Sequence, residues 1–270
     1  MNNDIIEKYQ KDSFEDLDAR WYWCSKGVQQ YSITKGLELG HTFFVSRDEE
    51  YSNQEGLYTP TKAYTSYQNA KTFLKKSKIC TTPRFYETVL GEGPCRLYAD
   101  LEWNLKTFSI DEIKQTFIRH IKKHVLTLNS EKELIFLNSC NEETDKGSLH
   151  VISPFYKFSS LEKQAQFWNQ IYIDLQVEGK YLFLHKTEKS YIPKTFIDFG
   201  VYTPKRIFRL VDSYKLVNGE YVRPLILESP NFKKIDSIIT NISGLEVEIQ
   251  VEETIGTKLE MRSTNNFPID

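Results

Sequence analysis

One short segment constrains this chain more than any other, because it places two acids in a strongly β-forming run. Successive side chains of a strand point to opposite faces, so segment 95–103 carries four apolar residues on one face: Leu97, Ala99, Leu101 and Trp103. Tyr98, Asp100 and Glu102 share the other face. The two acids lie roughly 7 Å apart along the strand, so their side chains can converge on one cation or cation pair. The pattern also fits the solvated face of a half-buried strand, and neighbouring motifs must decide between these interpretations.

Length, charge and cysteine spacing limit the class of protein. A chain of 270 residues can bury a large core, as one large domain or two closely packed modules. The net charge of -2 is not that of a uniformly basic nucleic-acid-binding protein, so any polyanion site must be local. The four cysteines have no Cys-x-x-Cys spacing, so we expect reduced thiols and no structural zinc. The polar N-terminus and the lack of a long apolar run predict a soluble, intracellular protein with no membrane contact.

Residues 1–90 are predicted to form a small mixed α/β module. Ser13, with Asp16 three residues later, is typical of a helix start. The segment 41–46 is predicted to be a strand, and the acidic segment 48–56 a surface loop.

The end of this module is strongly basic. Residues 61–84 contain no acid but six cations: Lys62, Lys71, Lys75, Lys76, Lys78 and Arg84. Tyr64, Tyr67 and Phe73 lie among them, and basic residues interleaved with aromatic ones are used to follow a nucleic-acid backbone and stack on bases. A lysine-rich, solvated helix face around residues 67–77 is an equally good interpretation of the same pattern.

The next part of the chain, residues 91–258, has regular periodicity. Capped helices are predicted from Ser109 and from Ser159, and strands over 134–139 and 148–153, the second ended by Pro154. Further strands are predicted at 195–199, 206–212, 221–227 and 245–251, with a helix containing Phe232, Ile235, Ile238, Ile239 and Ile242. The order strand, helix, strand, strand, helix, strand is that of a split βαβ unit, an open sheet with helices on one face, so the predicted fold class is α+β.

Polar residues in this region gather on the predicted strands. Ser148 and His150 share a strand face, and with Lys146 they can donate to phosphate oxygens, although a lone histidine on an apolar strand is often a core residue. Asp198 lies inside an apolar run, where an unpaired carboxylate is costly, so we expect it to be paired or to bind a metal. Arg209 and Lys215 are expected to lie near it. The set suits phosphoryl transfer, and a salt-bridge network is the alternative.

Three motifs, in this order, resemble the signatures of the archaeo-eukaryotic primase (AEP) superfamily: Asp100-x-Glu102, Ser148-x-His150 and Phe196-Ile197-Asp198. The longer stretches 85–104 and 198–210 resemble primase-polymerase (PrimPol) proteins. The resemblance covers residues 85–104, 146–153 and 196–215, and is weak before residue 80 and after residue 220. It implies a two-module core, in which an RRM-like split βαβ sheet over 91–258 bears the active site, the 1–90 module precedes it and 259–270 form a polar tail.

The resemblance also assigns roles to residues. Asp100, Glu102 and Asp198 would bind two Mg²⁺ or Mn²⁺ ions that activate a primer 3′-hydroxyl and stabilise the departing pyrophosphate. The triphosphate of the incoming nucleotide would be held by Lys146, Ser148, His150, Arg206, Arg209 and Lys215. Tyr86 would lie near the sugar and influence the choice between dNTP and NTP. The lysines at 62, 71, 75, 76 and 78 would contact DNA.

The resemblance implies a primase-polymerase that acts in DNA replication and damage tolerance. Its ligands would be a single-stranded DNA template, a primer and (d)NTPs, and its partners a helicase or a single-strand-binding protein. The chain lacks the Cys/His zinc module that PrimPol-like proteins use in priming and has a short segment between the second and third motifs, so primer extension is better supported than initiation. A two-metal nuclease and a non-catalytic nucleic-acid-binding module are the alternatives.

Overall fold

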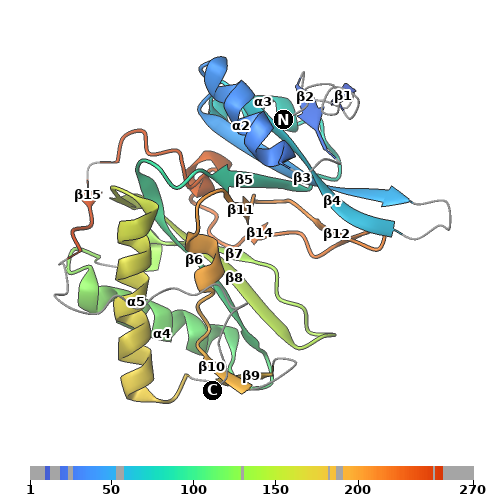
Figure 1. The fold of residues 1–270 in the computed structure, drawn as a ribbon. Helices are drawn as coiled ribbons and strands as arrows, with labels where there is room; N and C mark the ends of the chain where they lie inside the picture. The colour runs from blue at the N-terminus through green and yellow to red at the C-terminus, as the bar shows by residue number, and fades with distance from the viewer. Residues whose placement is uncertain are drawn as a thin grey trace, which may run out of the picture.

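The computed structural model confirms the α+β class, with helices packed on antiparallel sheets (Figure 1). It describes residues 10–12, 19–23, 27–52, 58–128, 131–181, 183–186, 191–245 and 247–251. The predicted helix start at Ser13 and the predicted tail 259–270 lie outside the described residues. No helix in the described part is long and apolar enough to cross a membrane.

A five-stranded sheet, sheet B, is built around two long strands, β6 (Cys95–Asn104) and β8 (Lys146–Phe158), which pair antiparallel. The other strands are β7 (Ile135–Asn138), β14 (Ile226–Leu227) and β15 (Val247–Glu248). β7 pairs with β8 on the side away from β6, and β14 pairs with β7. On the free edge of β6, Leu101 forms an isolated bridge with Ile197.

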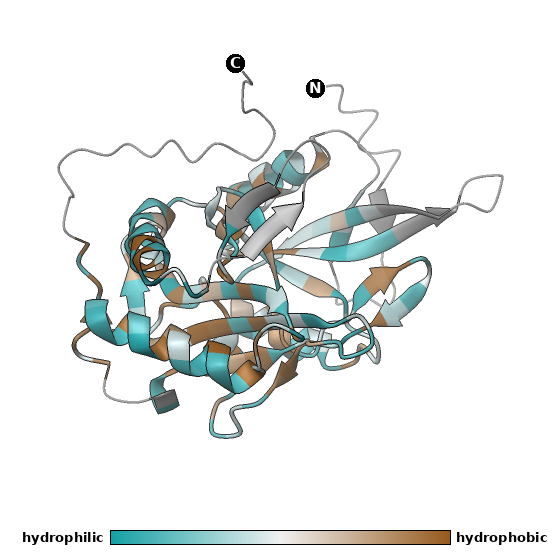
Figure 2. Cartoon of the chain, turned by 90° about the horizontal axis from the view of Figure 1, so that it is seen from below, coloured by the Kyte–Doolittle hydropathy of each residue, from teal (hydrophilic) through white to brown (hydrophobic). Residues whose placement is uncertain are grey.

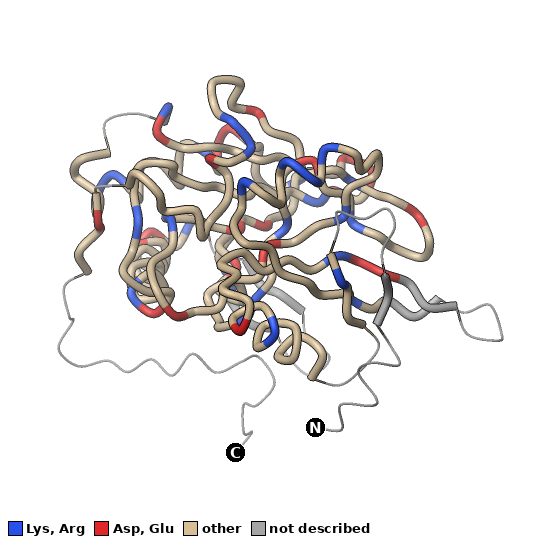
Figure 3. Tube along the Cα trace, turned by 90° about the horizontal axis from the view of Figure 1, so that it is seen from above, with Lys and Arg blue, Asp and Glu red and all other residues tan. Residues whose placement is uncertain are grey.

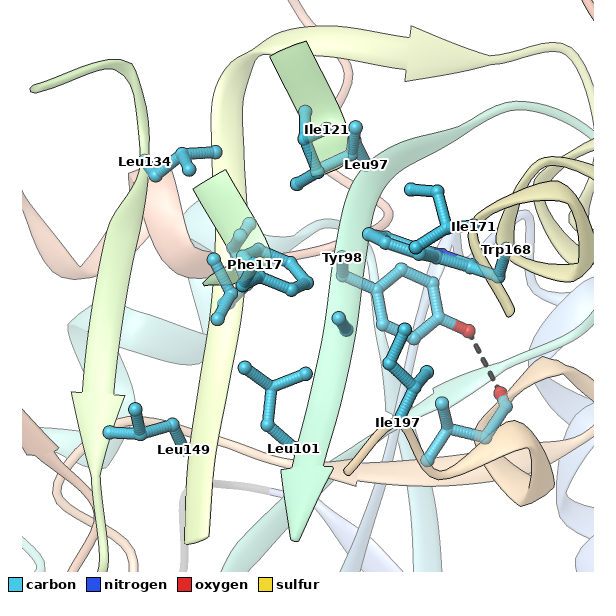
Figure 4. Close-up of a cluster of buried hydrophobic side chains, with 14 of the residues drawn as sticks. Leu97, Tyr98, Leu101, Phe117, Ile121, Leu134, Leu149, Trp168, Ile171 and Ile197 are labelled. Carbon is cyan, nitrogen blue, oxygen red and sulfur yellow. Dashed lines mark hydrogen bonds between the residues drawn. The ribbon is translucent and has the colours of Figure 1, made fainter. Parts of the chain in front are cut away.

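Two helices cover one face of sheet B, α4 (Ile110–His124) and α5 (Leu161–Glu178). Ser109 caps α4 as predicted, because its hydroxyl accepts from the backbone N–H of Glu112 at 3.2 Å. The α5 cap is Ser160 rather than the predicted Ser159. Phe117 of α4 stacks on Trp168 of α5, with the ring centroids 5.5 Å apart. Figure 4 shows these rings packed beside the apolar side chains of β6 and β8.

The other face of β6 is more buried than predicted. Tyr98 is fully buried, and its hydroxyl donates to the carbonyl of Val201 at 2.9 Å (Figure 4). Phe208 packs edge-on against the Tyr98 ring, with a centroid distance of 5.0 Å. A second layer therefore covers this face near Tyr98, and only the part that carries the acids remains less buried.

That second layer is sheet A, in the order β1-β2-β4-β3-β5-β11. Its strands are β1 (Gln10–Asp12), β2 (Arg20–Tyr22), β3 (Phe43–Ser52), β4 (Tyr58–Tyr67), β5 (Phe85–Val89) and β11 (Arg206–Arg209). Helices α2 (Val28–Glu38) and α3 (Ala70–Ser77) lie beside it (Figure 1). Phe73 of α3 packs against Phe43 and Phe85, each with a centroid distance of 5.3 Å. β11 comes from beyond residue 90, so this sheet combines segments of both predicted modules.

The remaining elements are short. They are the hairpins β9 (Phe183–Lys186)–β10 (Tyr191–Lys194) and β12 (Lys215–Val217)–β13 (Glu220–Val222), and the 3₁₀ turns η1 (Glu131–Glu133), η2 (Phe199–Tyr202) and η3 (Lys234–Ser237). Figure 2 shows hydrophobic and hydrophilic residues alternating along the helices and strands, as expected for elements buried on one side.

Two predicted boundaries were wrong because neighbouring strands override the local signal. The predicted loop 48–56 begins as strand, since β3 continues to Ser52 and Asp48 pairs with Lys62 of β4. Pro154 does not end β8, which continues to Phe158. The β6–β8 ladder is irregular between Ile152 and Lys157, so a proline without an N–H is tolerated there.

Two predicted elements are absent from the described residues. Segment 195–199 is not a strand but a single bridge followed by η2. The predicted helix around 232–242 is reduced to η3. Here the backbone N–H groups of Ile239 and Thr240 donate to the buried carboxylate of Glu87, at 2.9 and 2.8 Å. These donors are then not available for a helical ladder.

We predict that Gly147→Ala destabilises the protein by about 2 to 4 kcal/mol, because a Cβ at this position would overlap the Trp103 indole. Chemical denaturation would measure the free energy of unfolding. The double variant Gly147→Ala/Trp103→Leu should recover part of the loss, since the smaller side chain leaves room for the methyl group. Strictly additive effects of the two substitutions would contradict this explanation.

Candidate active site

The register of β6 and β8 brings the predicted polar residues together. Asp100 lies opposite His150, and Glu102 lies opposite Ser148. Residues directly opposite in an antiparallel pair point to the same face, so these four side chains form one group. Lys146, at the end of β8, reaches Glu102 with its Nζ 2.6 Å from Oε1.

Asp198 joins this group from the free edge of β6. Its backbone N–H donates to the carbonyl of Asp100 at 2.8 Å, and the N–H of Glu102 donates to the carbonyl of Phe196 at 2.7 Å. The Asp198 carboxylate accepts from the backbone N–H of Gly200 at 2.8 Å, which fixes it at the start of η2. A single carboxylate from a turn is thus held beside two carboxylates from a strand.

Asp100 is in an electrostatically unfavourable position. Its side chain is 16% exposed, but Oδ1 is inaccessible and has no hydrogen-bond partner among the residues that the structure describes. Burial, followed by the negative charges of Glu102 and Asp198, raises the pKa of Asp100 to about 8, against the weaker opposing effects of Arg209 and Lys146. A buried acid crowded by two other acids is a site that a cation would relieve.

His150 is buried beneath this carboxylate. Its ring packs on Phe208 with a centroid distance of 4.1 Å, and its Nε2 lies 3.8 Å from Oδ1 of Asp100. Burial and then the positive charge of Arg209 lower the pKa of His150 well below its ordinary value, so the ring is neutral at pH 7. In this conformation the His150 ring packs against the buried side of the Asp100 carboxylate, and the residue is only 5% exposed.

Arg209 links β11 to the residue that follows β7. Its guanidinium donates to Oγ of Ser139 at 2.6 Å and to the carbonyl of Arg223 at 2.9 Å. The Ser139 hydroxyl donates in turn to Oγ of Ser148 at 3.1 Å. Arg209 is therefore held by hydrogen bonds to neutral groups rather than by an ion pair, which keeps its charge available to a ligand.

Four cations are gathered here: Lys146, Arg209, Lys215 and Arg223. Burial and then repulsion by the other three cations lower the pKa of Lys215. The side chains of Lys215 and Arg223 have no salt bridge or hydrogen bond to any residue that the structure describes. Figure 3 shows that Lys and Arg positions are interspersed with Asp and Glu positions along the described chain. A group of four cations of which only Lys146 has a salt bridge to a described residue, placed beside carboxylates, is suited to a polyphosphate with bound metal ions.

Tyr86 lies directly opposite Arg209 in the β5–β11 pair. Its hydroxyl donates to Oδ2 of Asp48 at 2.6 Å, and the Lys62 ammonium lies 3.9 Å from the Tyr86 ring centroid while also pairing with Asp48. The same Asp48 oxygen accepts from the N–H of Leu216 at 3.2 Å. The Asp48 carboxylate thus binds Tyr86, Lys62 and the backbone of β12 at the same time.

The other predicted contact residues lie elsewhere. Arg206 is exposed, and its guanidinium lies near Gly200, on the Asp198 side of the group. Lys71, Lys75, Lys76 and Lys78 belong to α3 and its C-terminal end. This helix packs on Phe85, whose side chain points to the opposite face of sheet A from Tyr86. The α3 lysines are therefore separated from the carboxylates by the sheet, whereas Lys62 lies on the same face as Tyr86 and pairs with Asp48.

Sequence reasoning missed two residues of this group, Asp48 and Arg223. The local sequence predicts a loop at Asp48, although its spacing from Ser46 fits one face of a continuing strand. Arg223 follows β13 with a left-handed backbone (φ 47°), and no periodicity marks it. A non-glycine residue in that conformation at a site is a known sign of function, but it is visible only in coordinates.

The carboxylates of this group fit divalent metal ions whose remaining ligands come from a substrate. As the side chains stand, no group of three or more His, Cys, Asp or Glu residues in the described part is arranged to hold an ion alone. Mg²⁺ is usually bound by one or two carboxylates together with waters and substrate phosphates. Asp100, with its unpartnered buried oxygen, and the adjacent Asp198 match that requirement.

We predict that Asp100→Asn stabilises the metal-free protein at high pH. The pKa of Asp100 is about 8 in the folded chain against an ordinary value of 3.8. The folded state therefore binds the proton of the Asp100 carboxyl more tightly than the unfolded state does. The stability that this proton contributes is lost as pH rises from about 4 through about 8. The advantage of the variant should grow by about 2 to 4 kcal/mol over this range.

Urea denaturation with a chelator at both ends of the pH range would measure this difference. Asp111→Asn, at an exposed position in the first turn of α4, is the matched control for replacing a carboxylate outside the site. An Asp100→Asn advantage that is the same at low and high pH would contradict the prediction.

Comparisons with known proteins assign no family to this group of residues. No protein-family model matches the chain, and no curated protein matches it significantly. The function is therefore inferred from the side chains, their geometry and the resemblance of the motifs.

Proposed function

We propose that the chain is the catalytic core of a primase-type polymerase. It extends primers on a single-stranded DNA template with (d)NTPs, by nucleotidyl transfer that depends on two Mg²⁺ or Mn²⁺ ions. The observation that carries this proposal is the juxtaposition of three carboxylates with four cations: Asp100, Glu102 and Asp198 beside Lys146, Arg209, Lys215 and Arg223.

The carboxylates would hold the metal ions. When bound, such ions supply activation of the primer 3′-hydroxyl and neutralisation of charge on the departing pyrophosphate. The chain's own contribution is position. β6 supplies Asp100 and Glu102, and Asp198 caps the start of η2 with its carboxylate bonded to the Gly200 N–H. The Lys146–Glu102 pair, at 2.6 Å, would exchange for contacts to metal and phosphate when substrate binds.

The cations favour a polymerase over the other candidates. A nuclease needs carboxylates and metal ions but no group that recognises a free triphosphate. A non-catalytic binding module needs basic residues but gains nothing from a carboxylate whose pKa is raised to about 8 by burial and its acidic neighbours. Phosphoryl transfer from a nucleoside triphosphate uses both sets at once.

The order of elements supports the finer assignment to an AEP-type fold. From the free edge, sheet B runs from the Ile197 bridge through β6 and β8 to β7, with α4 and α5 on one face. This is the order of a split βαβ unit. On this proposal Tyr86 faces the nucleotide sugar, and Asp48 fixes its hydroxyl at 2.6 Å. Primer extension is favoured over initiation, and helicase or single-strand-binding partners belong to the same proposal.

Asp100→Ala and Asp198→Asn should each reduce primer extension by at least about 10³-fold. The asparagine can still accept from the Gly200 N–H, so η2 should stay intact. The measurement is extension of a labelled primer, made with Mg²⁺ or Mn²⁺ and with dNTPs or NTPs. Thermal melting checks that the variants are folded. A reaction without primer tests initiation. Undiminished extension by both folded variants would overturn the proposal.

Arg223→Ala should raise the KM for the incoming nucleotide by about 10-fold and change kcat much less, because it removes one charge from the phosphate-binding group. Arg119→Ala is the matched control, since Arg119 pairs with Glu178 on the helical side of sheet B. Steady-state extension at varied nucleotide concentration separates the two constants. Equal KM values for Arg223→Ala and the control would exclude Arg223 from the nucleotide site.

A further inference from the structure

A cavity of about 350 Å³ lies on the face of sheet A opposite Tyr86. Its apolar lining comes from α3, β5, the segment after β11 and the end of η3, and includes the buried residues Phe73, Phe85, Leu210 and Ile238. Phe85 and Tyr86 are consecutive in β5, so their side chains point to opposite faces. None of the three carboxylates lines this cavity, which is therefore separate from the candidate active site.

The rim of the cavity is basic. Lys78 and Lys234 line it, and the only acid in the described lining is Asp212, which pairs with Lys234. Lys71, Lys75 and Lys78 are spaced i, i+4 and i+7, so they form one exposed row along α3 that ends at the rim. The stretch 61–84, which supplies this row, contains no acid.

Aromatic side chains stand beside the same rim. Tyr214 lines the cavity and packs edge-on against Tyr221, with ring centroids 6.2 Å apart. Tyr221 is 43% exposed, and the Arg84 guanidinium lies 5.9 Å from its ring. An apolar floor with an aromatic wall and a track of cations is the combination that binds single-stranded nucleic acid, with bases stacked and the backbone neutralised.

We propose that this cavity is a second binding site for single-stranded nucleic acid, which receives one unstacked base. The adjacent phosphates lie on Lys78 and Lys234, and the backbone continues along Lys75 and Lys71. The volume is at the low end of the range for small-ligand sites, which suits one nucleoside rather than a larger ligand. The site does not require catalysis, because no residue of the carboxylate group contributes to it.

Photo-crosslinking tests the location directly. An oligothymidylate with bromodeoxyuridine should crosslink to residues 77–85 or 210–214, mapped by mass spectrometry. The wild-type protein and Asp198→Asn should give the same crosslinks, so this result stays interpretable even if the polymerase proposal fails. Crosslinks confined to β6, β8 and the surroundings of Tyr86 would overturn the second site.

Binding variants test its chemistry. For Lys78→Gln/Lys234→Gln, fluorescence anisotropy with a labelled oligothymidylate should show about 10-fold weaker binding and a salt slope smaller by about 1.4. Lys35→Gln/Lys180→Gln, at exposed positions on α2 and after α5, is the matched control and should bind as wild type. Equal effects of the two double variants would mean diffuse attraction and would overturn the site.

A cavity-filling variant separates the base pocket from the lysines. Thr81 is an exposed lining residue, and Thr81→Trp should weaken oligonucleotide binding several-fold while leaving the salt slope unchanged, because it blocks the base and not the phosphates. Unchanged affinity in this variant would overturn the base pocket. Thymidine monophosphate provides a last comparison: binding as tight as that of the oligonucleotide would assign the cavity to a free nucleotide and not to a strand.

Discussion

The antiparallel pairing of β6 with β8 is the interaction on which the rest of the structure depends. It sets Asp100 opposite His150 and Glu102 opposite Ser148, while Leu101 and Leu149 are fully buried on the other face. A slip of one residue would place the acids in the core and the leucines in the site, so the core packing and the site geometry are fixed by the same register. The helices α4 and α5 contribute to the site indirectly, because they cover the core face of sheet B and so help to fix this register.

The site retains an arrangement that a chain selected for stability alone would lose. Asp100 has a buried oxygen without a partner, and the negative charges of Glu102 and Asp198 outweigh the opposing effects of Arg209 and Lys146 on its pKa. Of these two cations, Lys146 is bonded to Glu102 and Arg209 is held by neutral groups. Cations are available within the same group, but Lys215 and Arg223 remain without salt bridges among the described residues. Unpaired charges of both signs next to each other are expected where a ligand carries the complementary charges.

The elements that the sequence predicts well are those whose pattern is local. The alternation over 95–103 and the capped, periodic α4 need only their own residues. The sequence does not predict the loss of the helix around 232–242, because its cause is Glu87, about 150 residues away in the chain, which takes the N–H groups of Ile239 and Thr240. The sequence misses Arg223 for a different reason, since its place in the site comes from a left-handed backbone conformation that no residue pattern marks.

The strand β11 gives the two proposed ligand sites a physical connection. Arg209, its last residue, points into the cation group, and Leu210, the next residue, lines the cavity on the other face. The N–H of Leu210 donates to the carbonyl of Phe85 at 3.0 Å, and the N–H of Tyr214 donates to that of Pro83 at 2.7 Å, so the segment between them is held at both ends. A base in the cavity would press on this tethered segment, and Lys215 directly follows it. The segment 209–215 therefore carries a cation of the first site at each end, while its middle residues line the cavity of the second.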